Sequence, residues 1–194
     1  MAVAGLGRRR TALIAARAYS EGESRWSKAQ RTAVFHLVRY ADSQDERDFD
    51  QYERALAIIR GDEMARKELQ KASPNLEIVR AGLLQAHSHS DDIDPAIALF
   101  RRFQRYHSMA KVIAIWETAD AHVERLDYAA RALHETVLRA HPAPERMKSI
   151  VQIVLAADAA LTPLTDEFGI AVGEAARDAQ RILLITVLGL VALL

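Results

Sequence analysis

The chain has 194 residues, and its 26 basic side chains balance 26 acidic ones. This neutrality argues against a nucleic-acid partner, because nucleic-acid-binding proteins normally carry a basic excess. The absence of cysteine excludes disulfides, thiol catalysis and cysteine-ligated metal sites. Half of the residues are hydrophobic and glycine is scarce, so we expect an ordered, all-α protein.

The chain starts with a short apolar run that ends in three arginines at positions 8–10. The run is too short for the core of a signal peptide. Residues 1–10 are therefore either a membrane-proximal leader or the end of a first transmembrane helix. From about Thr11 to Ala41 a helical period follows, whose apolar stripe is formed by Trp26, Ala33, Leu37 and Tyr40.

The next stretch predicts three helices separated by polar turns. Asp45 is a suitable N-cap for a helix over 46–72, in which Gly61 is a candidate bend. Its apolar stripe is Phe49, Tyr52, Leu56 and Ile59. A short helix over 76–86 follows the stop at Ser73-Pro74-Asn75, and another over 95–105 is expected to start with Asp94 as cap and Pro95 at its first position.

Two long helices with sustained seven-residue repeats complete the chain, near 107–140 and 145–181, separated by Pro142 and Pro144. Both apolar stripes alternate steps of three and four residues, and the second continues through Pro163 with a kink as the expected effect. The first stripe is Met109, Val112, Trp116, Ala119, Val123, Leu126, Ala130, Leu133, Val137 and Ala140. The second is Met147, Ile150, Val154, Ala157, Leu161, Leu164, Phe168, Ala171, Ala175, Asp178 and Ile182.

Residues 182–194 form a run of thirteen residues without a charge. A spanning helix needs about 20 apolar residues, so we interpret the run as the start of a truncated transmembrane helix. The buried end of a soluble helix and a short C-terminal anchor are the alternatives. The predicted architecture is an antiparallel four-helix bundle of long helices over 11–181, with two short extra helices and a C-terminal helix that continues into the membrane.

Several segments resemble a bacterial extracytoplasmic sensor module. The resemblance covers about residues 12–181. It is carried by residues 17–30 (RAYSEGESRWSKAQ), 39–41, 61–62, 81–84, 89–93, 114–116, 161–164 and 173–175. Modules of this kind occur in transmembrane receptors, most often diguanylate cyclases with or without a phosphodiesterase domain, and less often histidine kinases. No cyclase, kinase or PAS motif is present in this chain.

The resemblance implies a stimulus-sensing domain in the periplasm, anchored in the cytoplasmic membrane by residues 182–194, with an unknown small-molecule ligand. It implies control of cyclic-di-GMP turnover by a cytoplasmic output domain. The lack of a catalytic signature, together with the all-helical pattern, predicts no enzymatic activity in this chain. The arginines beside the apolar ends conflict with this orientation, because the positive-inside rule favours the cytoplasm for them. A homodimer is compatible with the seven-residue repeats, although the helices of one chain can also bury all of the apolar stripes against one another. The alternatives are a membrane-anchored helical scaffold without signalling output and a cytosolic helical enzyme.

Two groups of residues are candidates for ligand binding. An aromatic and basic group near the start of the chain would line a pocket, and a group of arginines near the second short helix would pair with an anion. Aromatic residues on a helical stripe are more often core, and arginines on a short helix are more often solvated. The candidates are Tyr19, Arg25, Trp26 and Lys28, and Arg101, Arg102 and Arg105.

One polar connection has the residue types of a metal site. His87, His89, Asp91 and Asp92 carry nitrogen and oxygen ligands at close spacing. The pattern is similar to the metal motif of metallo-β-lactamase-like hydrolases, but that fold needs strands and the sequence predicts none. A loop that caps the next helix accounts for the same residues, so we predict no cofactor, no metal and no catalytic residue.

Overall fold

The computed structural model describes the backbone of residues 2–139 and 143–192, and the side chains of residues 21–139, 143–178, 181, 182 and 185. These ranges hold six helices and no strand, which confirms the all-α prediction. The helices are α1 (Ala2–Ser43), α2 (Glu46–Leu69), α3 (Leu76–Gln85), α4 (Ser90–Phe103), α5 (His107–Val137) and α6 (Pro144–Ala192).

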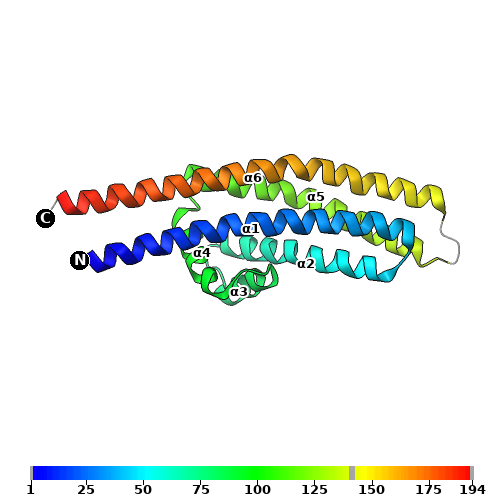
Figure 1. The fold of residues 1–194 in the computed structure, drawn as a ribbon, viewed down its shortest axis with the longest axis horizontal. Coiled ribbons are helices and arrows are strands. Elements are labelled where there is room, and N and C mark those ends of the chain that lie inside the picture. Colours follow the sequence, from blue (N-terminus) through cyan, green and yellow to red (C-terminus); the bar gives the residue numbers. More distant parts are fainter. Residues whose placement is uncertain (1, 140–142, 193–194) are drawn as a thin grey trace.

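The four long helices lie lengthwise beside one another, and successive ones run in opposite directions (Figure 1). α5 packs against α6, and α1 packs against both α2 and α6. The short helices α3 and α4 lie on α2 and α1 respectively, toward the end of the molecule where α1 begins and α6 ends. The first and last helices therefore extend from the described fold at the same end (Figure 1).

The apolar stripes predicted from the sequence form the core. All four predicted stripe residues of α1 are buried, and in α2 so are Tyr52, Leu56 and Ile59. The α5 and α6 stripes meet along their length, with Leu126, Leu133, Val154 and Leu161 fully enclosed. Pro163 is exposed on α6, which is a single helix through this position. Ala140 lies outside the described residues.

Some helix boundaries differ from the prediction. α1 begins at Ala2, earlier than the predicted start near Thr11, so residues 2–10 belong to the same helix as the core stripe. α4 begins at Ser90 and not at Pro95, because the His89 side chain accepts a hydrogen bond from Asp91 N at 3.3 Å and caps the helix five residues earlier. Acidic residues in the resulting first turn also favour this start.

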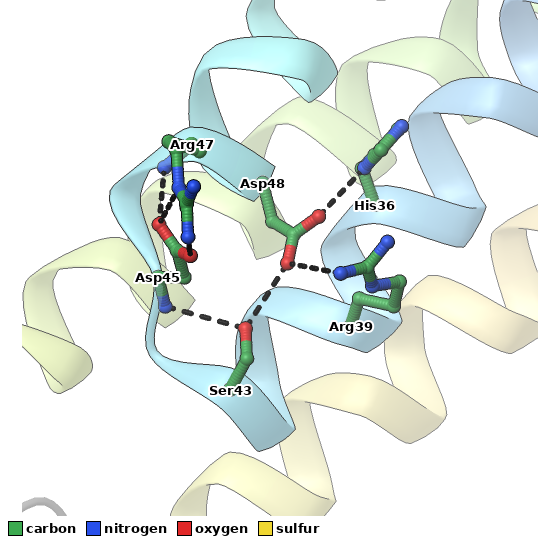
Figure 2. A network of polar contacts seen from close by, with 6 residues as sticks. All are labelled: His36, Arg39, Ser43, Asp45, Arg47 and Asp48. Carbon is green, nitrogen blue, oxygen red and sulfur yellow. Dashed lines mark hydrogen bonds and ion pairs between the residues drawn. The ribbon is translucent and has the colours of Figure 1, made fainter.

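A polar network fixes the turn between α1 and α2, at the end of the molecule opposite the chain termini (Figure 2). As predicted, Asp45 caps α2 by accepting a hydrogen bond from Arg47 N at 3.0 Å. The buried carboxylate of Asp48 accepts hydrogen bonds from His36 Nδ1 at 2.8 Å and Ser43 Oγ at 3.0 Å. The hydrogen bond from His36 lowers the pKa of Asp48, so this carboxylate stays ionised and holds the turn.

α2 and α3 cross at van der Waals contact through two glycines. A Cβ on Gly61 would lie 2.5 Å from the carbonyl oxygen of Gly82, and a Cβ on Gly82 would lie 2.6 Å from the carbonyl oxygen of Gly61. No other residue type fits either position. α2 is a single helix through Gly61, and this glycine admits the backbone of α3.

One stretch of the described residues is long and apolar enough to cross a membrane, judged by length and composition alone. It is Pro144–Asp178 in α6. One face of this stretch belongs to the core described above, which accounts for part of its apolar character. The predicted membrane segment at 182–194 continues the same helix as far as Ala192, but most of its side chains lie outside the described residues, and the prediction stays untested there.

Candidate functional site

A cavity of about 70 Å³ lies where the short helices meet the long ones. All six helices contribute to its wall, together with the connection between α3 and α4. α1 and α6, the two helices that leave the fold at the same end, contribute Trp26 and Phe168 respectively. The cavity is the natural candidate for a functional site, because concave, mostly apolar sites with a few polar groups are where small molecules bind.

The cavity contains a buried carboxyl group, that of Asp62 on α2. Asp62 is 6% exposed, and its carboxyl group accepts no hydrogen bond from any described residue. Burial raises the pKa of Asp62 to about 7, while the charge of Arg25 acts in the opposite direction. A carboxyl group that titrates near neutral pH inside a cavity is a common mark of a functional site.

Arg66, one helical turn beyond Asp62, is buried in the same wall. Its guanidinium forms an ion pair with Asp120 on α5 and donates to Gln70 Oε1 at 2.9 Å. It also lies over the Trp116 ring, with 5.7 Å from Cζ to the ring centroid. The Arg66 Nε is buried without an acceptor, so this arginine retains one unused donor in the wall.

Arg25 on α1 holds the α3–α4 connection against the long helices. It donates a hydrogen bond to Ser88 Oγ at 3.1 Å and lies 3.8 Å from the Glu21 carboxylate. Its Nε is also buried and has no acceptor. The cavity wall on this side therefore depends on a contact between α1 and the connection that precedes α4.

Aromatic rings cover much of the remaining wall. Trp26, Phe100, Trp116 and Phe168 come from four different helices. Trp116 and Phe168 contact one another edge to face, with 5.1 Å between centroids. Flat π faces beside a desolvated carboxyl group suit ligands that combine an apolar body with a polar or charged end.

Beside the cavity, a series of side-chain hydrogen bonds joins α1 to α6. Gln30 Nε2 donates to Asp158 Oδ1 at 2.9 Å, and Thr165 Oγ1 donates to Gln30 Oε1 at 3.1 Å. Thr165 also lines the cavity. A change in the cavity that moves Thr165 therefore acts on the contact between the first and last helices.

The structure places two of the predicted ligand-binding residues in this cavity, Arg25 and Trp26. Lys28 is exposed on α1 and does not line it. Arg101, Arg102 and Arg105 are exposed at the end of α4 and beyond it, so they do not belong to this site. The side chain of Tyr19 lies outside the described residues.

The four candidate metal ligands do not converge. His89 is occupied as the cap of α4, and His87 adopts a left-handed φ of 60° in the connection before it. Asp91 is exposed, whereas Asp92 lines the cavity. In the part of the chain that the structure describes, no three His, Asp or Glu side chains are close enough to hold a metal ion.

Sequence reasoning missed Asp62 and Arg66, although α2 carried a signal for both. The apolar stripe Tyr52, Leu56 and Ile59 continues at the same spacing into Asp62, Arg66 and Leu69, all of which are buried. Charged residues on the buried stripe of a helix are rare unless they are paired or functional. Trp116, predicted as a core residue, is a wall residue of the cavity.

Comparisons of the chain with models of known protein families, with curated proteins and with solved structures found no match.

Proposed function

We propose that this chain is the extracytoplasmic input module of a transmembrane receptor, built as an antiparallel four-helix bundle whose cavity receives the stimulus. The observation that carries the proposal is the shared wall of the cavity. α1 and α6 both line it, and both leave the fold at the same end (Figure 1). A ligand in the cavity therefore contacts the two helices that would connect the bundle to a membrane.

The signal would be a change in how α6 packs against α1. Thr165 and Phe168 line the cavity on α6, and Thr165 also bonds to Gln30 on α1. A ligand shifts such an equilibrium only by binding one packing arrangement more tightly than the other. Because α6 is a single helix from Pro144 to Ala192, a shift at the cavity would be transmitted along its length.

The apolar character of α6 and the uncharged run 182–194 support attachment to the cytoplasmic membrane. The resemblance to receptor sensor modules supports a periplasmic bundle and a cytoplasmic output domain that controls cyclic-di-GMP turnover. A second copy of the chain would pair along the outer face of α6, where Leu155 and Ile170 are exposed.

A cavity-filling variant tests this function without knowledge of the ligand. Residues 1–194 are joined through a transmembrane helix to a diguanylate cyclase catalytic domain, and cyclic-di-GMP is measured in cells. Ala119 is buried in the cavity wall, so Ala119→Leu occupies part of the space that a ligand would take. We expect a several-fold change in output, in either direction, relative to the unmodified fusion.

The matched control is Ala121→Leu, two residues along α5 at an exposed position. It adds the same side chain outside the cavity, so output should stay at the level of the unmodified fusion. Equal output from all three fusions would contradict the proposal.

The alternative function is a membrane-anchored helical scaffold without signalling output. The exposed apolar residues of α6 favour it, because a partner helix would cover them. A scaffold predicts that Ala119→Leu leaves the fusion's output unchanged, whereas Ile153→Lys abolishes partner binding.

A further inference from the structure

The cavity holds more carboxyl groups than free cations. Its charged wall residues are Glu23, Asp62 and Asp92 against Arg25 and Arg66. Arg66 is already paired with Asp120, which lies outside the wall. Arg25 lies near Glu21 and donates to the neutral hydroxyl of Ser88, and it is the one wall cation whose charge acts on Asp62. A cation is therefore the ligand charge that the cavity lacks.

Asp62 is the carboxyl group best placed to contact such a ligand. It lines the cavity, it is buried, and no described residue donates a hydrogen bond to it. A buried carboxylate without a donor is unfavourable, and a bound N–H group would remove that penalty. Asp92 and Glu23 are more exposed, so they contribute charge to the rim and not a desolvated acceptor.

The aromatic walls provide the second element of cation recognition. Trp116 already accepts one cation over its face, the guanidinium of Arg66. Trp26 lines the cavity as well, and in the described part of the chain no ring or guanidinium stacks on its indole. An organic ammonium ion is attracted to the face of tryptophan more strongly than to any other side-chain ring.

We propose that the cavity binds a short alkylammonium ion, whose N–H groups donate to the Asp62 carboxylate and whose charge lies against the Trp26 ring. The size of the cavity sets the length of the ligand. Its 70 Å³ is about half of the roughly 150 Å³ that encloses benzene in an engineered apolar cavity. The proposal rests on the proposed function, in which the cavity receives the stimulus.

Ammonium binding would depend on pH through Asp62, because only the ionised carboxylate attracts a cation. The charged groups that face it are Glu23 and Arg25 from α1, Arg66 on α2 and Asp92 from α4; the α3, α5 and α6 residues of the wall carry no titratable group. Burial raises the pKa of Asp62 to about 7. Affinity should therefore fall by up to about tenfold for each pH unit below that value.

Intrinsic fluorescence provides the assay, because both tryptophans of the chain line the cavity. Residues 1–194 in lipid nanodiscs are titrated at about pH 8 with n-propylammonium chloride. Propan-1-ol and sodium acetate serve as neutral and anionic probes of the same number of heavy atoms. We expect a saturable change with n-propylammonium and none with the other two probes.

Two variants test the role of the carboxylate. Asp62→Asn keeps the shape but removes the charge, and it should weaken n-propylammonium binding by about tenfold or more. Asp50→Asn changes an exposed carboxylate on the same helix and should leave binding unaltered. Circular dichroism verifies that both variants are folded.

Saturable binding of propan-1-ol or acetate with affinity equal to that of n-propylammonium would overturn the ammonium proposal while leaving the cavity as a ligand site. No saturable binding by n-propylammonium, or unchanged affinity in folded Asp62→Asn, would also overturn it. The proposed function fails separately, because the Ala119→Leu output experiment contains no added ligand.

Discussion

The buried carboxyl group of Asp62 should make the protein less stable as pH rises, and Asp62→Asn should remove that effect. The pKa of Asp62 is about 7 in the folded chain and near its ordinary 3.8 in the unfolded chain. Between these values the folded chain keeps a proton that the unfolded chain has lost. The contribution of Asp62 to the free energy of unfolding is therefore fully present below the pKa of the unfolded chain. It is lost as the pH rises from there to the pKa of the folded chain.

The magnitude follows from the same two values. A difference of about three pH units, at about 1.4 kcal/mol per unit, corresponds to about 4 kcal/mol lost between about pH 4 and pH 7. Asparagine has no charge to desolvate at any pH. The variant should thus equal the wild type near pH 4 and be more stable by up to about 4 kcal/mol near pH 8.

Urea unfolding followed by circular dichroism, at about pH 4, 6 and 8, measures this difference. Other titrating groups contribute equally to wild type and variant, so subtraction isolates Asp62. Asp50→Asn, exposed on the same helix, should stay within about 0.5 kcal/mol of wild type at every pH. A stability difference for Asp62→Asn that is independent of pH, or a variant less stable near pH 8, would show that Asp62 is not a buried carboxyl group with a raised pKa.

Four further substitutions have defined outcomes. Gly61→Ala should destabilise the fold by about 1–3 kcal/mol in thermal unfolding, because the added Cβ meets the α3 backbone. Gly173→Ala, whose Cβ meets only the flexible end of Arg177, should be neutral or stabilising by up to about 1 kcal/mol; equal losses in both would refute the close crossing. Asp120→Asn should cost about 1.5–3 kcal/mol in urea unfolding, since it removes the charged acceptor nearest the buried Arg66 guanidinium while Glu117 stays 3.8 Å away, and a loss below about 0.5 kcal/mol would show that water reaches this pair. Pro163→Ala should raise the thermal midpoint, because an exposed proline interrupts the hydrogen bonding of α6, and it should alter the output of the cyclase fusion; unchanged output would argue against transmission through α6.

The helices were predictable because each carries a long periodic stripe. The α5 and α6 stripes were correct at nearly every described position, from Met109 and Ile150 onward, since sustained three-and-four spacing has no competing interpretation. The predicted start of α4 was wrong. Asp94-Pro95 is a strong local signal for a helix start, but His89 caps the helix earlier in the chain. A cap formed by histidine is not among the usual sequence signals.

The site was only partly predictable. Arg25 and Trp26 were candidates because a basic and an aromatic residue lie side by side near the start of the chain. Asp62 and Arg66 can be found only by noticing that charged residues continue the buried stripe of α2. The contact of Gly61 with α3 depends on a crossing in three dimensions. No periodicity within one helix reveals it, because it joins residues of two helices through their backbones.

If the cavity controls the position of α6 relative to α1, a change in the cavity must alter a distance between these two helices. Gly169 lies beside Glu23, and Ile185 is sixteen residues further along α6, about 24 Å at 1.5 Å per residue. The chain has no cysteine, so spin labels at Ser24→Cys and Ile185→Cys, both exposed positions, are specific.

Double electron–electron resonance on residues 1–194 in nanodiscs measures the distance between the two labels in the doubly labelled chain and in its Ala119→Leu and Ala121→Leu variants. We expect Ala119→Leu to shift the label distance by about 1–2 Å, the scale of helix shifts in switching proteins, and Ala121→Leu to leave it unchanged. Identical distance distributions in all three chains would contradict this expectation.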